Sequence, residues 1–418
     1  MTDQLDVYLD GALTGRLTRS AGGRVSFDYA AGAVPGSLSV SMPASVTHHE
    51  PEVVMPWLDN LLPDSDEVRA RWAAGFGLRR VTPFGLLEFV GADCAGAVQI
   101  LPVGAAPVDA GELIPVSDAD IAAQIRALRA DSAAWGFPNR GGRWSLGGQQ
   151  GKFALARTAD GRWVVPSGRA ASTHIVKVGV AGVPEADVAE YVTMRVARLL
   201  GLPVAETEYQ VFDGEAALVT TRFDRLAGPE GVRRLHQEDL CQALGLWRTV
   251  KYEADGGPSA ADVVALLRRA LDPRDRRRGV EDFARSQVFN WLVAGTDAHA
   301  KNYALLHVGS RVVLAPFYDL IGTAYLWGGK PVHFEGRLAM KFGGEYRLRK
   351  VDSGRLDQAA AELGVDAGFL ADTARTYADR LPDATRTALA RLPDVVGPAV
   401  RQAMVERLAG RLTWTTAG

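Results

Sequence analysis

The sequence is poor in cysteine, has no long apolar run and carries no excess of either charge. Its two cysteines, Cys94 and Cys241, are too few for a disulfide framework or a cysteine-ligated zinc site. No run approaches the length needed to cross a bilayer. The net charge of -2 over 418 residues does not favour a chain that binds nucleic acid through its overall charge. These absences predict a cytoplasmic protein that does not enter a membrane.

Histidine is also sparse. The seven histidines show no HxxxH or similar ligand spacing, so a zinc hydrolase is not favoured. A metal-dependent hydrolase built on Asp297, His299 and Asp319 remains open as an alternative at this point.

The composition is that of a globular protein, with 47% hydrophobic and 23% charged residues and enough length for two or three packed units. Residues 1–45 alternate between apolar and polar, which predicts a small antiparallel sheet. Residues 51–77 have apolar side chains at helical spacing. Strands are expected over 84–91 and 94–103. We assign residues 1–105 to an N-terminal β/α module.

Pro63 interrupts the helical spacing within this module. Asp64 or Ser65, just after it, suits the cap of a second helix, because short polar side chains accept hydrogen bonds from the first free amides. We therefore predict two helices here rather than one.

The order of elements over 106–223 is informative. Two strand-like segments flank a glycine turn, a third strand carries Lys177 in its middle, and a helix and a hairpin follow: 143–146, 147–151, 152–157, 173–180, 184–201 and 207–223. This is the order of parts in the N-terminal lobe of a protein kinase. Residues 224–418 show the 3.6-residue period. The fold class expected is α+β, a two-lobed protein-kinase-like fold with the N-terminal module added and an all-helical C-terminal lobe.

The glycine turn is not a Walker A loop, because Leu146 and Phe153 stand where that motif needs glycine and Ser or Thr. Two strands instead hold a flap whose glycines let backbone amides approach phosphate oxygens. Its residues Gly147, Gly148 and Gln149 are expected to bind the phosphates of ATP.

Two lysines follow the turn. Lys152 would add positive charge to the phosphate site. Lys177 lies either at a sheet edge facing water or in a site with a partner. In a kinase it would reach the α- and β-phosphates and pair with Glu190 on the next helix; the alternative for Glu190 is an exposed helical acid.

Chemically useful residues gather again at the end of an apolar segment. Asp297, His299, Lys301 and Asn302 lie within six residues, and Asp319 follows 22 positions after Asp297. Phosphoryl transfer requires a carboxylate near the attacking hydroxyl, oxygen ligands for magnesium and a lysine beside the phosphates. We predict that Asp297 orients the hydroxyl and accepts its proton, and that Asn302 and Asp319 hold Mg²⁺. His299 either braces the loop or contacts phosphate.

Six arginines cluster around Pro273: Arg268, Arg269, Arg274, Arg276, Arg277 and Arg278. A solvated, mobile loop is the usual meaning of such a run. Contact with phosphate or an acidic partner is the alternative.

The motifs together resemble the HipA-like serine/threonine kinase toxins of bacterial toxin–antitoxin pairs. The matching stretches run in collinear order through most of the chain: DNLLPDS at 59–65, SLGGQQGK at 145–152, THIVKV at 173–178, RFDR at 222–225, QEDLCQALG at 237–245, KYEADGGP at 251–258, QVFNWLVAGTDAHAKN at 287–302 and PFYD at 316–319.

The resemblance implies roles for individual residues. The family position that matches Asp297 is catalytic, and those that match Asn302 and Asp319 bind magnesium. The position that matches Lys177 binds ATP, so all four roles agree with the expectations above. Backbone groups near Phe223 would hold the adenine, and His299 and Tyr318 would line the nucleotide site. The serine matching Ser145 is autophosphorylated in the family, which ejects the glycine loop and stops the kinase; added negative charge beside a phosphate pocket would repel ATP.

The resemblance also implies partners. The substrate would be an aminoacyl-tRNA synthetase, such as glutamyl-tRNA synthetase. A HipB-like helix-turn-helix antitoxin dimer would bind the chain and make most of the contact with operator DNA. Thr221 replaces the acid common before RFD in the family, and the loop has GGQQGK rather than GAQEK, so loop dynamics and substrate choice are open.

Two other functions fit part of this pattern. One is a catalytically weak binding module that acts as a co-repressor through a DNA-binding antitoxin. The other is a small-molecule or lipid kinase, which would share the same site chemistry and differ in the phosphoacceptor.

Overall fold

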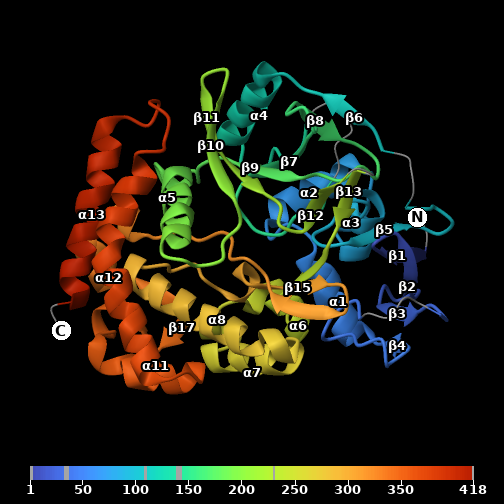
Figure 1. Cartoon of the computed structure of the whole chain (residues 1–418). Coiled ribbons are helices and arrows are strands. Elements are labelled where there is room, and N and C mark those ends of the chain that lie inside the picture. Colours follow the sequence, from blue (N-terminus) through green and yellow to red (C-terminus); the bar gives the residue numbers. More distant parts are fainter. Residues whose placement is uncertain (1–2, 33–36, 108–110, 138–143, 229–230, 417–418) are drawn as a thin grey trace.

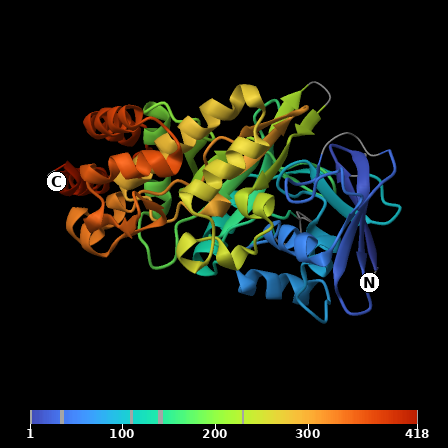
Figure 2. The same ribbon diagram turned by 90° about the horizontal axis from the view of Figure 1, so that it is seen from below.

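The computed structural model describes residues 3–32, 37–107, 111–137, 144–228 and 231–416. Figures 1 and 2 show the N-terminal module at one end of the molecule and the last helices at the other, with the strands and helices of two lobes between them. No helix in the described ranges combines the length and the apolar character that crossing a bilayer requires. The predicted domain boundaries near 105 and 223 stay predictions.

The N-terminal module is a five-stranded antiparallel sheet in the order β4-β3-β2-β1-β5, covered by three helices. Its apolar side chains pack into one core around Val7, Phe27 and Trp57. The elements are β1 (Gln4–Leu9), β2 (Ala12–Arg19), β3 (Val25–Tyr29), β4 (His48–His49), α1 (Pro51–Asn60), α2 (Asp66–Gly75), α3 (Pro83–Val90) and β5 (Val98–Pro102).

One strand predicted in this module is wrong. Residues 84–91 lie largely in α3, because Pro83 occupies the first turn and the Thr82 hydroxyl accepts from the Gly85 amide at 3.2 Å. The two predicted helices before it are present, and Ser65 rather than Asp64 caps α2 by accepting from the Val68 amide. An apolar run of eight residues does not by itself distinguish a buried helix from a strand.

The N-terminal lobe is a six-stranded antiparallel sheet in the order β10-β11-β9-β7-β8-β6. Lys177 therefore stands in a central strand, between β11 and β7, and is buried. Residues 144–146 form no strand, contrary to expectation, and Arg143 lies outside the described residues. The elements are β6 (Leu113–Pro115), α4 (Asp118–Ala130), β7 (Lys152–Arg157), β8 (Trp163–Pro166), β9 (His174–Lys177), α5 (Ala186–Leu199), β10 (Thr207–Phe212) and β11 (Glu215–Thr221).

The C-terminal lobe is mainly helical, but it is not all-helical as predicted. Antiparallel strands β14, β15 and β16 form a small sheet beside the helices. Strands β15 and β16 are apolar and flank Gly309, whose φ of 61° favours glycine at the turn. The strands are β12 (Arg225–Gly228), β13 (Gly231–Arg234), β14 (His236–Asp239), β15 (Ala304–Val308), β16 (Arg311–Leu314), β17 (Arg337–Phe342) and β18 (Glu345–Arg347).

The helices of this lobe share one large apolar core, which also takes in α5 of the other lobe through Val188, Val192 and Val196. Helix α5 thus positions Glu190 against both lobes. The helices are α6 (Leu240–Leu244), α7 (Ala260–Ala270), α8 (Pro273–Val293), α9 (Ala324–Trp327), α10 (Gly329–Glu335), α11 (Leu356–Leu363), α12 (Ala367–Leu389) and α13 (Pro398–Thr416).

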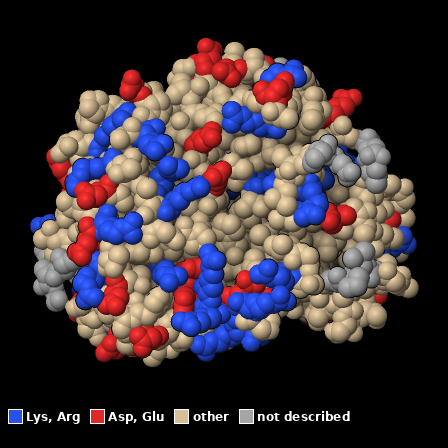
Figure 3. Space-filling view, in the orientation of Figure 1, with Lys and Arg blue, Asp and Glu red and all other residues tan. Residues whose placement is uncertain are grey.

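The arginine cluster is helical rather than a loop. Asp272 caps α8 and Pro273 begins it, so the arginines lie at the end of α7 and in the first turns of α8. Figure 3 shows lysine and arginine side chains gathered over these helices. Several pair with acids, such as Arg277 with Glu281 at 2.7 Å and Arg278 with Asp282 at 3.5 Å. The prediction that the cluster is solvated is correct for Arg277 and Arg278, whose side chains are 91% and 80% exposed.

A buried ion-pair network joins the N-terminal module to the segment after β11. Arg225 bonds Asp93 Oδ1 and Asp224 Oδ2 at 2.9 Å each, and Arg222 bonds Asp224 Oδ2 at 2.8 Å. Both arginines also donate to the Cys94 carbonyl. Burial raises the pKa of Asp93, but the guanidinium groups of Arg222, Arg225 and Arg234 outweigh it and the net shift is downward. The RFDR motif is therefore a structural connection between module and lobe.

We expect Arg225→Met to lower the free energy of unfolding by about 3 kcal/mol or more, because it leaves buried carboxylates short of a cation. Unfolding in urea measures the loss. Arg386→Met is the control, because Arg386 and Asp383 are an exposed pair and its removal should cost no more than about 0.5 kcal/mol. Equal stabilities for the two variants would contradict a structural role for the network.

Candidate active site

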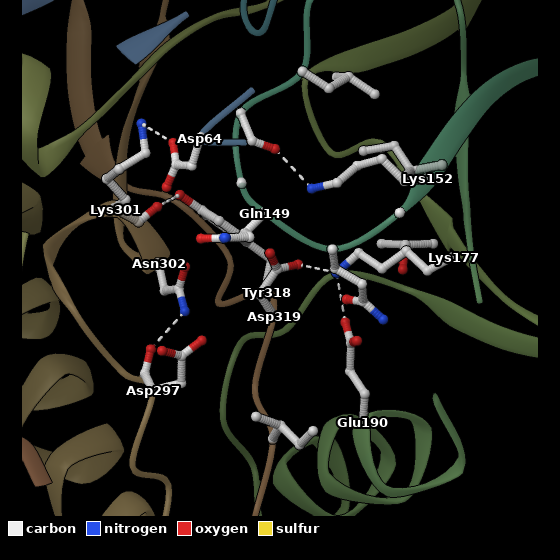
Figure 4. Close-up of a pocket in the computed structure, with 18 of the residues that line it drawn as sticks. Asp64, Gln149, Lys152, Lys177, Glu190, Asp297, Lys301, Asn302, Tyr318 and Asp319 are labelled. Atoms are coloured by element: carbon white, nitrogen blue, oxygen red, sulfur yellow. Dashed lines mark hydrogen bonds and ion pairs between the residues drawn. The ribbon is translucent and has the colours of Figure 1, made fainter. Parts of the chain in front are cut away.

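A cavity of about 810 Å³ lies between the lobes and is lined by all three parts of the chain. Figure 4 shows its side chains converging from β9, α5, the glycine turn and the segments around Asp297 and Asp319. Every predicted site residue except Ser145 lines it: Gly147, Gly148, Gln149, Lys152, Lys177, Glu190, Phe223, Asp297, His299, Asn302, Tyr318 and Asp319.

The Lys177 amine is the centre of the site. It donates to Glu190 Oε1 at 2.6 Å and also forms an ion pair with Asp319 Oδ1. Burial lowers the pKa of Lys177, but the two carboxylates outweigh it and the net shift is upward. Burial likewise raises the pKa of Asp319, and Lys177 and Lys152 reverse that shift. The amine is therefore charged and the Asp319 carboxylate ionised.

The backbone around Asp319 is unusual. Its φ of 54° lies in the left-handed region, which a non-glycine residue adopts only when its surroundings impose it. Such residues concentrate at functional sites. Here the conformation turns the carboxylate toward Lys177 (Figure 4).

The loop after α8 carries Asp297 and Asn302. Asn302 Nδ2 donates to the Asp297 carbonyl at 2.7 Å, which leaves the amide oxygen of Asn302 free to face the cavity (Figure 4). That oxygen and the Asp319 carboxylate are ligands of the kind Mg²⁺ prefers. Among the described residues no group of three or more His, Cys, Asp or Glu could hold a metal ion. Two protein oxygens fit magnesium, which takes its other ligands from water and phosphate.

His299 belongs to the same loop, and its side chain is buried. Burial lowers its pKa to about 4 despite the nearby Asp297, so the imidazole is neutral at pH 7. Its Nδ1 is buried without a hydrogen-bond partner in the described chain. The residue lines the cavity, and the edge-on packing of the Tyr252 ring, with centroids 4.8 Å apart, braces the loop.

Lys301 lines the cavity, but its amine is paired with other residues of the cavity wall. Its amine bonds Asn60 Oδ1 at 2.7 Å and Asp239 Oδ2 at 3.2 Å, and lies 3.6 Å from Asp64 Oδ1. The lysine of this loop therefore attaches it to the N-terminal module. Lys152 and Lys177 are the lysines next to the glycine turn and Asp319.

The glycine turn is held from both sides. Gly148 has a φ of 94°, in the left-handed region that favours glycine. The Gly148 carbonyl accepts from the Asp64 amide at 2.8 Å. The Lys152 amine donates to the Gly147 carbonyl at 2.7 Å. Burial and the charge of Lys177 lower the pKa of Lys152 to about 8, although Asp319 opposes the shift.

The segment after β11 forms the remaining wall. Phe223 stacks on Tyr318 with ring centroids 5.7 Å apart, and the Tyr318 hydroxyl donates to the Lys301 carbonyl at 2.7 Å. Within the described chain, the backbone amide and carbonyl of Phe223 form no hydrogen bond. A planar base with donor and acceptor edges fits between such groups.

Comparison with known proteins places this geometry in a family. A model of the HipA N-terminal domain matches residues 5–101, and a model of the HipA-like C-terminal domain matches residues 144–389, more than half of the chain. The chain belongs to the HipA family. The predictions of a HipA-like protein, a serine/threonine protein kinase and an α+β kinase-like fold are thus confirmed.

Several relatives are similar over most of their length. A candidate kinase of Sinorhizobium fredii, Y4mE, is 33% identical over 86% of each chain. The serine/threonine-protein kinase toxin HipA of Shewanella oneidensis is 29% identical over 82% of this chain and 79% of its own. A solved Shewanella oneidensis HipA, in complex with HipB and its operator DNA, superposes with a TM-score of 0.83 at 26% identity, covering 98% of this chain and 97% of that one.

Ser145 of this HipA-family chain lies outside the cavity. Its side chain is fully buried, and its hydroxyl donates to the Leu61 carbonyl at 2.7 Å. Its amide donates to the Asp93 carbonyl at 2.9 Å. A phosphate could not reach this hydroxyl without displacement of the residues around it.

Sequence reasoning gave no site role to Asp64 or Lys251, which line the cavity, or to Tyr252, which contacts Asp297. Asp64 bonds Lys251 Nζ at 2.7 Å, and the Tyr252 hydroxyl donates to Asp297 Oδ1. The stretches DNLLPDS and KYEADGGP, which contain these residues, could have indicated a site role, because both matched the family. Asp64 was interpreted as a helix cap because it precedes one.

We expect Lys177→Met to destabilise the protein by about 3 kcal/mol, because Glu190 would stay buried without its cation. Lys177→Met/Glu190→Gln should recover most of that loss, since a neutral amide has no charge to desolvate. Urea unfolding at neutral pH compares the variants. If the double variant is no more stable than the single one, Glu190 does not depend on this lysine.

Proposed function

We propose that this chain is an ATP- and Mg²⁺-dependent serine/threonine protein kinase acting as the toxin of a toxin–antitoxin pair. In the cytoplasm it would arrest growth by phosphorylating a translation enzyme, an aminoacyl-tRNA synthetase such as glutamyl-tRNA synthetase. The observation that supports this best is the convergence of Lys177, Asp297, Asn302 and Asp319 on one cavity from separate parts of the sequence.

Each side chain has a task in transferring the γ-phosphoryl group. Lys177, held by Glu190, would bind the α- and β-phosphates, and the glycine turn with Lys152 would cover them. Asp297 would orient the acceptor hydroxyl and take its proton. Asn302 and Asp319 would hold Mg²⁺, which supplies positive charge to the phosphates when bound.

Adenine would lie against Phe223, whose backbone groups are free to bond it, and Tyr318 and His299 would complete the nucleotide site. Autophosphorylation of Ser145 would end activity. A phosphate on Ser145 does not fit in the space where its hydroxyl now bonds the Leu61 carbonyl, so the glycine turn would be displaced. The negative charge of the phosphate would also repel ATP.

The partner proposed is a HipB-like helix-turn-helix antitoxin dimer that makes most of the contact with operator DNA. The likeness to the HipA that was solved with HipB and operator DNA supports this. The chain's net charge of -2 favours DNA contact through the antitoxin.

We expect Asp297→Asn to bind ATP but to transfer almost no phosphate, because only the group that orients the acceptor is lost. Transfer from labelled ATP to the chain itself or to myelin basic protein, with mass spectrometry at Ser145, measures the reaction. ATP at about 100 times its Kd, with magnesium present, should stabilise the wild-type protein and the Asp297→Asn variant by about 2.7 kcal/mol each. EDTA should reduce this effect.

An unaltered melting temperature with ATP would favour the co-repressor module instead of a kinase. If the wild-type protein transfers phosphate only to small molecules or lipids, a small-molecule or lipid kinase is favoured.

ATP affinity should depend on the charge of Lys152. The amine is protonated below its pKa of about 8 and neutral above it, so its attraction for phosphate is present at low pH and is lost as pH rises through that value. We expect ATP binding by calorimetry to weaken from about pH 7 to about pH 9.5. Lys152→Met should bind more weakly and with less pH dependence. The same pH dependence in both proteins would assign the titration to another group.

A further inference from the structure

Tyr252 contacts Asp297 and His299, which line the cavity, and belongs to a segment that the backbone holds firmly. It stands between two short 3₁₀ turns, Arg248–Val250 and Glu253–Asp255. The Lys251 carbonyl accepts from the Ala300 amide at 3.1 Å, and Glu253 accepts from the Lys341 amide at 2.7 Å. The tyrosine is therefore fixed relative to the loop that carries Asp297.

Its hydroxyl donates to Asp297 Oδ1, and its ring packs edge-on against His299. Burial and the negative charge of Asp297 raise the pKa of the Tyr252 hydroxyl well above its ordinary range. The hydroxyl therefore remains a donor at neutral pH and cannot serve as a base.

Asp297 needs such a contact because little else restrains its side chain. The side chain is 51% exposed, and its nearest imidazole atom, His299 Nε2, is 3.9 Å from Oδ1. Within the described part of the chain, Oδ2 receives no hydrogen bond. One carboxylate oxygen is thus held by tyrosine, while the other is available to a hydroxyl that enters the cavity.

We propose that Tyr252 is a positioning residue that holds Asp297 by Oδ1 so that Oδ2 meets the acceptor hydroxyl. In the transfer, the acceptor oxygen bonds the γ-phosphorus, the bond from that phosphorus to the β–γ bridging oxygen breaks, ADP leaves, and the acceptor proton passes to Oδ2. Tyr252 itself gives up no proton. This inference rests on the proposed kinase function and adds a residue to it.

An opposite role follows from the same contact if the tyrosine hydroxyl occupies the place of the acceptor. In that case Tyr252 would compete with substrate, and its removal would raise activity. A positioning role predicts a loss instead, because a mobile carboxylate is aligned for transfer only part of the time. The sign of the change therefore separates the two.

The test is Tyr252→Phe, which removes one oxygen and keeps the ring against His299. We expect kcat for transfer from labelled ATP to myelin basic protein to fall roughly ten- to a hundredfold, with the KM for ATP unchanged. Tyr8→Phe is the matched control, because the Tyr8 hydroxyl donates to the Ala105 carbonyl in the N-terminal module. Its kcat should equal that of wild type, and both variants should unfold at the wild-type urea midpoint.

A double-mutant cycle with Asp297→Asn, read in single turnovers with enzyme in excess, tests the dependence on Asp297. Tyr252→Phe should add no further loss to Asp297→Asn, since the residue acts through that carboxylate. An unchanged or raised kcat overturns the proposal, as does an additive loss in the double variant, whatever its unfolding midpoint. If wild type transfers no phosphate, the proposed function fails and this inference fails with it.

Discussion

The site depends on one buried amine shared by two carboxylates. Lys177 comes from a central strand, Glu190 from α5 and Asp319 from the segment after β16. A buried lysine is stable only with such partners, so the contact couples the relative positions of three elements and both lobes. The cavity exists where this contact brings them together.

The N-terminal module is part of the same arrangement. Its segment 59–65 contacts both loops of the cavity: the Asp64 amide donates to the glycine turn, and Asn60 accepts from Lys301 of the loop that carries Asp297. The Leu61 carbonyl accepts from Ser145. Together with the buried ion pairs around Asp93, these contacts make the module a support for catalysis. A change in segment 59–65 would reach the phosphate site through these hydrogen bonds.

The errors in the sequence-based description have local causes. The strand predicted over 84–91 is a helix because the preceding Thr-Pro pair caps and starts one. The hairpin of β15 and β16 was missed within a lobe in which most segments have helical spacing. Lys301 was grouped with the phosphate-binding residues by its nearness in sequence to Asp297, whereas its side chain extends to Asn60, 241 positions earlier.

The sequence by itself determined the family, the order of the kinase elements and the chemical types available at the site, because motifs and periodicity are local properties of a chain. Only the tertiary structure decided which of these groups meet. The contact of Lys177 with Asp319, the burial of Ser145 against Leu61 and the contact of Tyr252 with Asp297 all join residues distant in sequence. Whether a buried polar group has a partner depends on packing between elements, and no local pattern records that packing.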